Sequence, residues 1–179
     1  MTSKSHKPSA KAAQIRALRP GDIAACAALV ASTPLWQRYG YDAARCAADL
    51  GAALARKDDL HVAVDGAAVL GLAWVLPRGG FGRSPYLKLL AVAESARGLG
   101  VGALLLRAAE HRGELFLLVS DFNRGARRFY RREGYRRLGA LPDYVVPGVT
   151  ELLLHRRISS RLTPRVTPKT PGPRSRPRR

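Results

Sequence analysis

The sequence YLKLLAVAESARGLGVGALLLR, residues 86–107, decides how the rest of the chain is interpreted. It begins with an apolar run that ends at Val92, passes through a glycine-rich turn, and continues as an apolar helix from Ala103 to His111. The first amides of a helix lack intrahelical acceptors, and glycines leave no side chain between the backbone and a ligand. The stretch therefore predicts an anion site at the start of this helix.

Two general interpretations of the glycines come first. Gly98, Gly100 and Ala103 match the dinucleotide fingerprint G-x-G-x-x-A, and Asp121 lies about twenty residues further on, where a ribose-binding acid is expected. That fingerprint places its first glycine at the end of the strand, whereas residues 93–97 intervene here. The alternative is an ordinary loop between a strand and a helix, in which the glycines serve turn geometry alone.

A third interpretation has support elsewhere in the chain. Arg97, Gly100 and Gly102 form R-x-x-G-x-G after the run 90–92. About twenty residues later, FLLVSDFNRGARRFYRREGY (residues 116–135) contains a second pattern formed by Asn123, Ala126, Phe129, Tyr130, Gly134 and Tyr135. In this order and spacing, the two patterns resemble the signatures of the GNAT superfamily of acyl-CoA-dependent N-acyltransferases. The resemblance covers roughly residues 14–158.

The order of elements fits that resemblance. Periodicity and turn signals predict strands at 15–19, 60–64, 69–76, 87–92, 115–120, 135–141 and 149–158, with helices after Asp22, after Asp42, at 100–112 and at 124–133. Asp65-Gly66 predicts a type I′ hairpin, and 77–84 a flexible loop that breaks the sheet. The resemblance implies a mixed α/β (α+β) fold: a mostly antiparallel sheet of six to seven strands, a parallel pair at the cofactor site, and about four helices.

The resemblance also implies acetyl-CoA as cosubstrate and a set of binding residues. Backbone amides of the glycine turn would bind the pyrophosphate, and the preceding strand would pair with the pantetheine arm. The implied cofactor residues are Leu90, Ala91, Val92, Arg97, Gly98, Leu99, Gly100, Val101, Gly102, Ala103 and Asn123. Asn123 could equally cap the helix that follows it.

Tyr130 is the candidate general acid, because it matches the family tyrosine seven residues after Asn123. A phenol is protonated at neutral pH and can donate a proton as thiolate character develops on the CoA sulfur. The alternative is that Tyr130 only packs in the core. Many relatives carry a glutamate as general base on the strand at 116–120, which is apolar here. The remaining acids near the expected cleft are Glu94, Asp121, Asp143 and Glu151. A water relay could equally take the amine proton.

The acceptor pocket is expected around the loop STPLWQRYGY, residues 32–41. Aromatic side chains in a loop either cover the edge of the core or shape a binding pocket. The candidate substrate-binding residues are Trp36, Arg38, Tyr39 and Tyr41, with Tyr144 from the loop at 142–148. The acceptor would be the primary amine of a small molecule or a protein.

Composition limits the remaining possibilities. The 46% hydrophobic content suits one globular domain, predicted at 15–158. No apolar run approaches the ~20 residues that span a bilayer, so a cytoplasmic protein without membrane contact is expected, as monomer or homodimer. Cys26 and Cys46 lie in alanine-rich segments typical of buried, reduced thiols. Four scattered histidines predict no metal site.

The net charge of +18 is partly a property of the two ends. Residues 1–14 hold three basic side chains and residues 159–179 hold seven, both without an acid, which leaves +8 on residues 15–158. Both ends are predicted to be disordered arms. Three functions stay open: an acetyl-CoA-dependent N-acetyltransferase, a CoA-binding module without catalysis, and an RNA- or ribosome-associated factor that binds nucleic acid only through its basic tail.

Overall fold

The computed structural model describes residues 13–110 and 113–157. The elements in chain order are β1 (Gln14–Ala17), α1 (Ile23–Ala31), α2 (Pro34–Arg38), α3 (Ala43–Ala55), β2 (Asp59–Asp65), β3 (Ala68–Gly80), β4 (Ser84–Val92), α4 (Val101–Ala109), β5 (Glu114–Ser120), α5 (Arg124–Arg132), β6 (Arg136–Pro142) and β7 (Thr150–Arg157).

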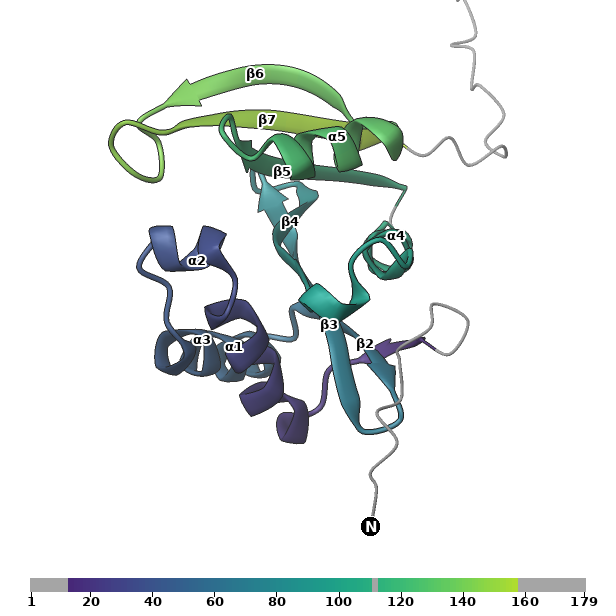
Figure 1. Ribbon diagram of the computed structural model, residues 1–179. Coiled ribbons are helices and arrows are strands. Elements are labelled where there is room, and N and C mark those ends of the chain that lie inside the picture. Colours follow the sequence, from purple (N-terminus) through teal and green to yellow (C-terminus); the bar gives the residue numbers. More distant parts are fainter. Residues whose placement is uncertain (1–12, 111–112, 158–179) are drawn as a thin grey trace, which may run out of the picture.

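Within these residues the strands form one seven-stranded sheet in the order β1-β2-β3-β4-β5-β7-β6. Every neighbouring pair is antiparallel except β4 and β5, which are parallel. Figure 1 shows α1 and α3 on one side of the sheet and α4 on the other, with α5 beside β5 and β7. The predicted mixed, mostly antiparallel fold with one parallel pair is confirmed.

The core has two parts because the inner strands are covered on both faces. One cluster joins α1 and α3 to the sheet and contains Cys26, Cys46, Leu72 and Trp74. The other joins α4 and α5 to the opposite face, and it contains Tyr130. Cys26 and Cys46 are both buried free thiols, which matches the packing role predicted from their sequence context.

The parallel pair parts soon after it forms. Only Tyr86 with Phe116 and Leu87 with Leu117 are in register between β4 and β5. Beyond them β4 stays paired with β3 as far as Val92, while β5 is paired with β7 as far as Ser120. The side of β4 that faces β5 therefore lacks ladder partners over its last residues, and it forms a wall of the cleft described below.

The structure corrects three local predictions. Residues 77–80 continue β3 and pair back onto β4 through Gly80 and Ser84, so the predicted loop at 77–84 is mostly sheet. The predicted loop at 32–41 contains a helix, α2, with Pro34 in its first turn, where a missing N–H costs nothing. In the hairpin after β2 only Gly66 has positive φ, so the turn is not type I′, because Ala67 carries a Cβ that disfavours positive φ.

Helix capping follows the sequence in part. Asp42 caps α3 by accepting a hydrogen bond from the Arg45 amide at 2.8 Å, as its position before the helix predicted. Asp22 was expected to cap α1 in the same way, but its carboxylate instead accepts from the Arg19 amide at 2.8 Å and from the Arg16 guanidinium. That ion pair holds the pKa of Asp22 at about 2, below its ordinary value.

The predicted arms lie almost wholly outside the described residues; of them only Ala13 and Gln14 are described, and Gln14 begins β1. Within the part of the chain that is described, no helix has the length and apolar character needed to cross a membrane.

A substitution at Gly71 tests how tightly β3 packs against α4. A Cβ at this position would lie 2.8 Å from the Ala91 carbonyl oxygen and 2.8 Å from a Leu105 methyl carbon. We expect Gly71→Ala to lower the free energy of unfolding by about 1–3 kcal/mol, because backbone cannot move aside cheaply. Chemical denaturation measures the effect. Gly51→Ala is the control: nothing lies within 4 Å of its Cβ position, and in α3 it should stabilise by about 0.5–1 kcal/mol. Equal effects of the two changes would contradict this packing.

Candidate functional site

A cleft of about 1010 Å³ runs between the parted strands. Its walls come from α2 and the residues before it, the end of β4, the glycine turn, the start of α4, and α5. The sequence-predicted residues along it are Trp36, Arg38, Leu90, Ala91, Val92, Arg97, Gly98, Gly100, Val101, Gly102, Ala103, Asn123 and Tyr130. The fold thus gathers both sequence patterns and part of the aromatic loop around one space.

The glycine turn presents unpaired amides to this space. Among the described residues, the N–H groups of Gly98, Gly100, Val101 and Gly102 have no acceptor, whereas that of Ala103 donates to the Gly100 carbonyl at 3.0 Å. Gly98 and Gly100 adopt φ values of 77° and 83°, a conformation that a residue with a Cβ rarely takes. The turn and the first amides of α4 can therefore bind an anion through the backbone.

The exposed edge of β4 offers a second set of backbone groups. Leu90, Ala91 and Val92 are paired with β3 on one side, and all three line the cleft on the other. Because β5 has already parted from β4, an extended ligand could lie along this edge as an additional strand does.

The α5 side of the cleft contributes Asn123 and Tyr130. The Asn123 side-chain oxygen accepts from the Ala126 amide at 3.1 Å, so it caps α5 and fixes the helix at the cleft. Tyr130 packs edge-on against Tyr135, with ring centroids 5.5 Å apart, and is only 7% exposed. Asn123 caps α5 and also lines the cleft, so capping and cofactor binding are compatible. Tyr130 packs in the core and also lines the cleft, so packing and proton donation are compatible as well.

The Tyr130 hydroxyl has no hydrogen-bond partner within the described residues, although buried hydroxyls are normally satisfied. Burial raises the pKa of Tyr130, and the neighbouring Tyr86 raises it further. The phenol therefore stays protonated well into the alkaline range and keeps its proton available to a ligand.

The α2 side closes the other wall. The Arg38 guanidinium lies over the Phe122 ring at 4.1 Å from its centroid, and both residues line the cleft. This contact joins α2 to the segment that precedes α5, since cation–π pairs favour this face-on geometry. Trp36 lines the cleft as well and packs against Tyr41 with ring centroids 5.8 Å apart.

Tyr39 ties α2 to the far half of the sheet. Its hydroxyl donates to Glu151 at 2.5 Å and lies 2.6 Å from the Ser120 hydroxyl. Since a phenol has one proton, Ser120 is the donor in the second contact. Burial, then the bond to Glu151, raises the pKa of Tyr39 to about 12. Glu151 and Ser120 are both 4% exposed, so the three groups form a buried polar cluster.

Four predicted residues do not line the cleft, and Tyr39, which is held in the cluster with Glu151 and Ser120, is one of them. Leu99 belongs to the glycine turn but is not among the residues that line the cleft. Tyr41 donates to Asp49 at 2.8 Å and supports Trp36 from behind. Tyr144 is 66% exposed in the loop between β6 and β7.

Sequence reasoning overlooked other cleft residues, namely Thr33, Pro34, Leu35, Ala96, Phe122, Arg124, Gly125, Arg132 and Glu133, besides Ala126 and Phe129, which it used only as pattern positions. Thr33, Pro34 and Leu35 adjoin the aromatic residues of the predicted loop at 32–41, and the others lie within or beside the two patterns, which was the signal that could have found them.

The carboxylates that were considered as the general base differ in their exposure and in their partners. Glu94 and Asp121 are exposed, and Asp143 accepts from the Gly148 amide in its own loop. Glu151 is buried with Tyr39. Glu133, just after α5, is the acid that lines the cleft among the described residues, and the basic lining residues are Arg38, Arg97, Arg124 and Arg132. The cleft is therefore positive overall and suits an anionic ligand.

Within the described ranges, no three histidine, cysteine, aspartate or glutamate side chains lie close enough to hold a metal ion.

Comparisons with known proteins agree with this geometry. Residues 56–137, which include the glycine turn and the α5 pattern, match the family model described as the acetyltransferase (GNAT) domain. A blasticidin-S acetyltransferase from Streptomyces morookaense is 39% identical over 74 residues, which cover 38% of this chain and 54% of that protein. The match thus spans about half the length of this curated relative.

Solved structures share the fold over most of the chain. A protein assigned to the GNAT family of acetyltransferases from Desulfovibrio desulfuricans superposes with a TM-score of 0.69 at 21% identity, covering 82% of this chain and 99% of that one. An aminoglycoside 6′-N-acetyltransferase complexed with coenzyme A gives a TM-score of 0.68 at 18% identity, covering 84% and 99%.

The Tyr39 cluster generates a stability prediction. Tyr39→Phe removes the donor to a buried carboxylate, so we expect the free energy of unfolding to fall by about 1–3 kcal/mol. Thermal and chemical denaturation measure it. Tyr144→Phe is the matched control, because that hydroxyl is exposed, and it should change stability by less than about 0.5 kcal/mol. If Tyr39→Phe were as neutral as the control, the cluster would not hold α2 to the sheet.

Proposed function

We propose that this chain, whose residues 56–137 match the family model of the acetyltransferase (GNAT) domain, transfers an acetyl group from acetyl-CoA to a primary amine. One observation carries the proposal: the glycine turn, the edge of β4 and Tyr130 line the same cleft, and within the described ranges the turn amides, that strand edge and the Tyr130 hydroxyl have no partners. These are the groups needed to bind a diphosphate, an extended amide-containing arm and a developing thiolate.

The cofactor proposal rests on complementary chemistry. Gly98, Gly100, Val101 and Gly102 would donate to the pyrophosphate, and the side chains of Arg97 and Arg124 would add positive charge at the same end. Leu90, Ala91 and Val92 would pair with the pantetheine amides. A solved protein of the same fold, the aminoglycoside 6′-N-acetyltransferase, holds coenzyme A.

In the proposed reaction, the amine nitrogen attacks the thioester carbonyl, a C–N bond forms and the C–S bond breaks. Tyr130 donates a hydrogen bond and then its proton to the departing sulfur, because its hydroxyl is protonated and has no partner among the residues that the structure describes. The amine loses a proton and leaves as an amide. Neither cysteine of the chain lies in the cleft, so transfer is direct in a ternary complex rather than through an acyl-thiol.

The amine proton leaves through water. Glu151 is buried and engaged by Tyr39, and Glu133 shares the cleft with four arginines. We therefore assign neither carboxylate as the direct base. The acceptor would then bind between Trp36, Arg38 and Phe122 and react as the free amine.

An acceptor screen tests the function. The panel contains blasticidin S, because the curated relative is named for it, together with an aminoglycoside, polyamines, amino acids and peptides with a free N-terminus. Release of free thiol from acetyl-CoA is followed for each acceptor, and mass spectrometry checks for one added acetyl group. We expect turnover with at least one amine. Tight CoA binding with no active acceptor would instead support the CoA-binding module without catalysis.

The Tyr130 hydroxyl can be removed without changing the ring. Tyr130→Phe should lower kcat roughly 100-fold or more, because the sulfur loses its proton donor, while affinity for CoA stays within about twofold. Steady-state kinetics and equilibrium CoA binding measure the two effects. Tyr86→Phe is the control, since its hydroxyl bonds the Leu118 backbone and does not line the cleft. Unchanged turnover in Tyr130→Phe would remove this residue from the mechanism.

The pH profile follows from the raised pKa of Tyr130. A raised pKa means that the proton donor remains in its active, protonated form as pH rises, whereas the amine becomes reactive only as it loses its proton. With an alkyl amine acceptor, kcat/KM should therefore rise from about pH 7 to about pH 10 without a descending limb. A bell-shaped profile, in which kcat/KM already declines before about pH 9, would contradict the assignment of Tyr130 as the acid and of water as the base.

A further inference from the structure

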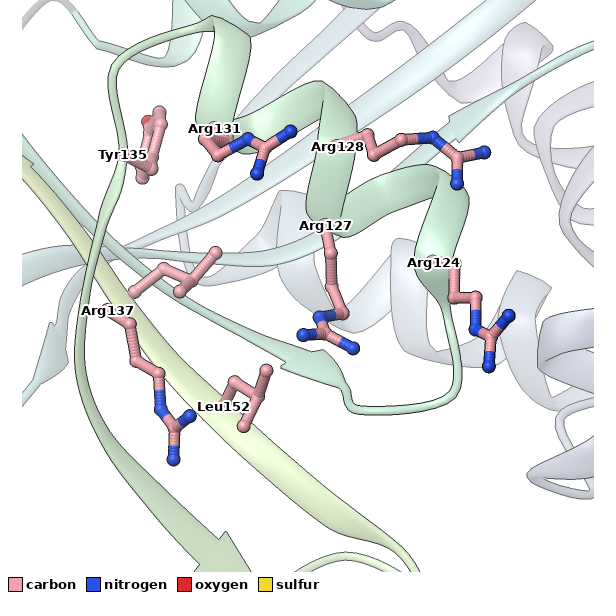
Figure 2. A pocket seen from close by; sticks show the side chains of 8 residues that line it. Arg124, Arg127, Arg128, Arg131, Tyr135, Arg137 and Leu152 are labelled. Carbon is pink, nitrogen blue, oxygen red and sulfur yellow. The ribbon is translucent and has the colours of Figure 1, made fainter.

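A second hollow, of about 360 Å³, lies on the other side of α5, between this helix and the strands β6 and β7. Figure 2 shows four arginines along α5 with Arg137 and Leu152 across from them. The lining residues are Arg124, Arg127, Arg128, Arg131, Tyr135, Arg137, Leu152 and Leu154. Of these, only Arg124 also lines the acetyl-transfer cleft.

The arginines of α5 form a single stripe. Positions 124, 127, 128 and 131 follow the i, i+3, i+4, i+7 spacing that brings side chains to one face of a helix. Like charges at these spacings destabilise a helix by about 0.2–0.5 kcal/mol per pair. Within the described residues, none of the five arginines of the hollow pairs with a carboxylate. The repulsion within this stripe therefore lowers the free energy of unfolding.

A neighbouring arginine shows the contrast. Arg156 donates to both oxygens of the buried Glu110 at 3.0 and 3.1 Å, so its charge is neutralised inside the protein. In the hollow, Arg127 donates to the Asp121 carbonyl at 2.7 Å and Arg137 to the Gly139 carbonyl at 3.3 Å. Carbonyls hold these two guanidinium groups in place without neutralising them, and further N–H donors remain on each.

From this arrangement we propose that the hollow binds the phosphodiester backbone of a nucleic acid. Guanidinium groups bind phosphate oxygens through paired N–H donors, and no base-specific group is needed for backbone contact. From Arg124 to Arg131 the stripe runs roughly 10 Å along the helix axis, which exceeds one phosphate group and suits a run of them.

The composition of the C-terminal sequence favours a polymer over a single small anion. Leu152 and Leu154 of the hollow lie on β7, which ends at Arg157. The next residues in the sequence, 159–179, add seven basic side chains and no acid. The sequence alone had pointed to this tail as the only nucleic-acid contact, whereas the hollow adds a second basic segment, within the described residues, that a chain of phosphates could bind.

Two variants of the full chain separate the hollow from general basicity. The first is R127Q/R128Q/R131Q, which spares Arg124 because of its place in the acetyl-transfer cleft. The control is R78Q/R83Q/R107Q, three exposed arginines outside both spaces. Each variant lowers the formal net charge by three. Circular dichroism and CoA binding confirm that both are folded and keep the cleft.

Fluorescence anisotropy with a single-stranded RNA of about 12 nucleotides, and with DNA of the same sequence, measures binding across a salt series. We expect the α5 variant to bind either strand at least tenfold more weakly than wild type, and its plot of log affinity against log salt to flatten by about 2, as three lost phosphate contacts require. The control should change affinity less than threefold. Comparison of RNA with DNA identifies the preferred sugar.

The proposal is overturned if both variants weaken binding equally, since the effect would then be one of net charge alone. It is also overturned if labelled polyglutamate or inorganic phosphate binds the hollow as tightly as the oligonucleotides and with the same dependence on the three arginines. These measurements do not involve acetyl transfer. The nucleic-acid proposal can therefore be refuted while the acetyltransferase proposal stands, and the acetyltransferase proposal can be refuted while the nucleic-acid proposal stands.

Discussion

The separation of β4 from β5 is the constraint on which the rest of this site depends. Two residue pairs hold the parallel strands together, and beyond them the sheet opens. An open edge leaves backbone groups without partners, which an uninterrupted sheet does not tolerate in its interior. The same parting brings α4 and α5 to opposite sides of one space, so that unpaired amides of the glycine turn and the Tyr130 hydroxyl line it together.

Much of this was predictable because it is local. Apolar alternation marked the strands, and a strand followed by R-x-x-G-x-G marked the turn in which Gly98 and Gly100 take positive φ. Asn123, which caps α5, and Gly134, which has positive φ just after it, were both recognisable from the sequence. Tyr130 was assigned from the resemblance, as the tyrosine seven residues after Asn123. The match of residues 56–137 to the family model of the acetyltransferase (GNAT) domain agrees with that resemblance, and the solved structures share the predicted fold.

What escaped prediction depends on contacts between distant segments. Tyr39 meets Glu151 across 112 positions of the sequence, and Arg38 meets Phe122 only because α2 folds against the start of α5. Nothing local indicates either contact. The arginines of α5 are apparent in the sequence. Only the structure shows that β6 and β7 leave a hollow beside them, in which none of the described lining residues is a carboxylate.

Hydrogen exchange in the presence and absence of CoA tests the central claim most directly. Unpaired amides exchange quickly, and a ligand that accepts from them slows that exchange. The account predicts slower exchange on CoA addition in the segment from Leu89 to Ala103, which holds the open edge of β4 and the glycine turn, and little change in β1 and β2. Binding of CoA without slower exchange in that segment would contradict it.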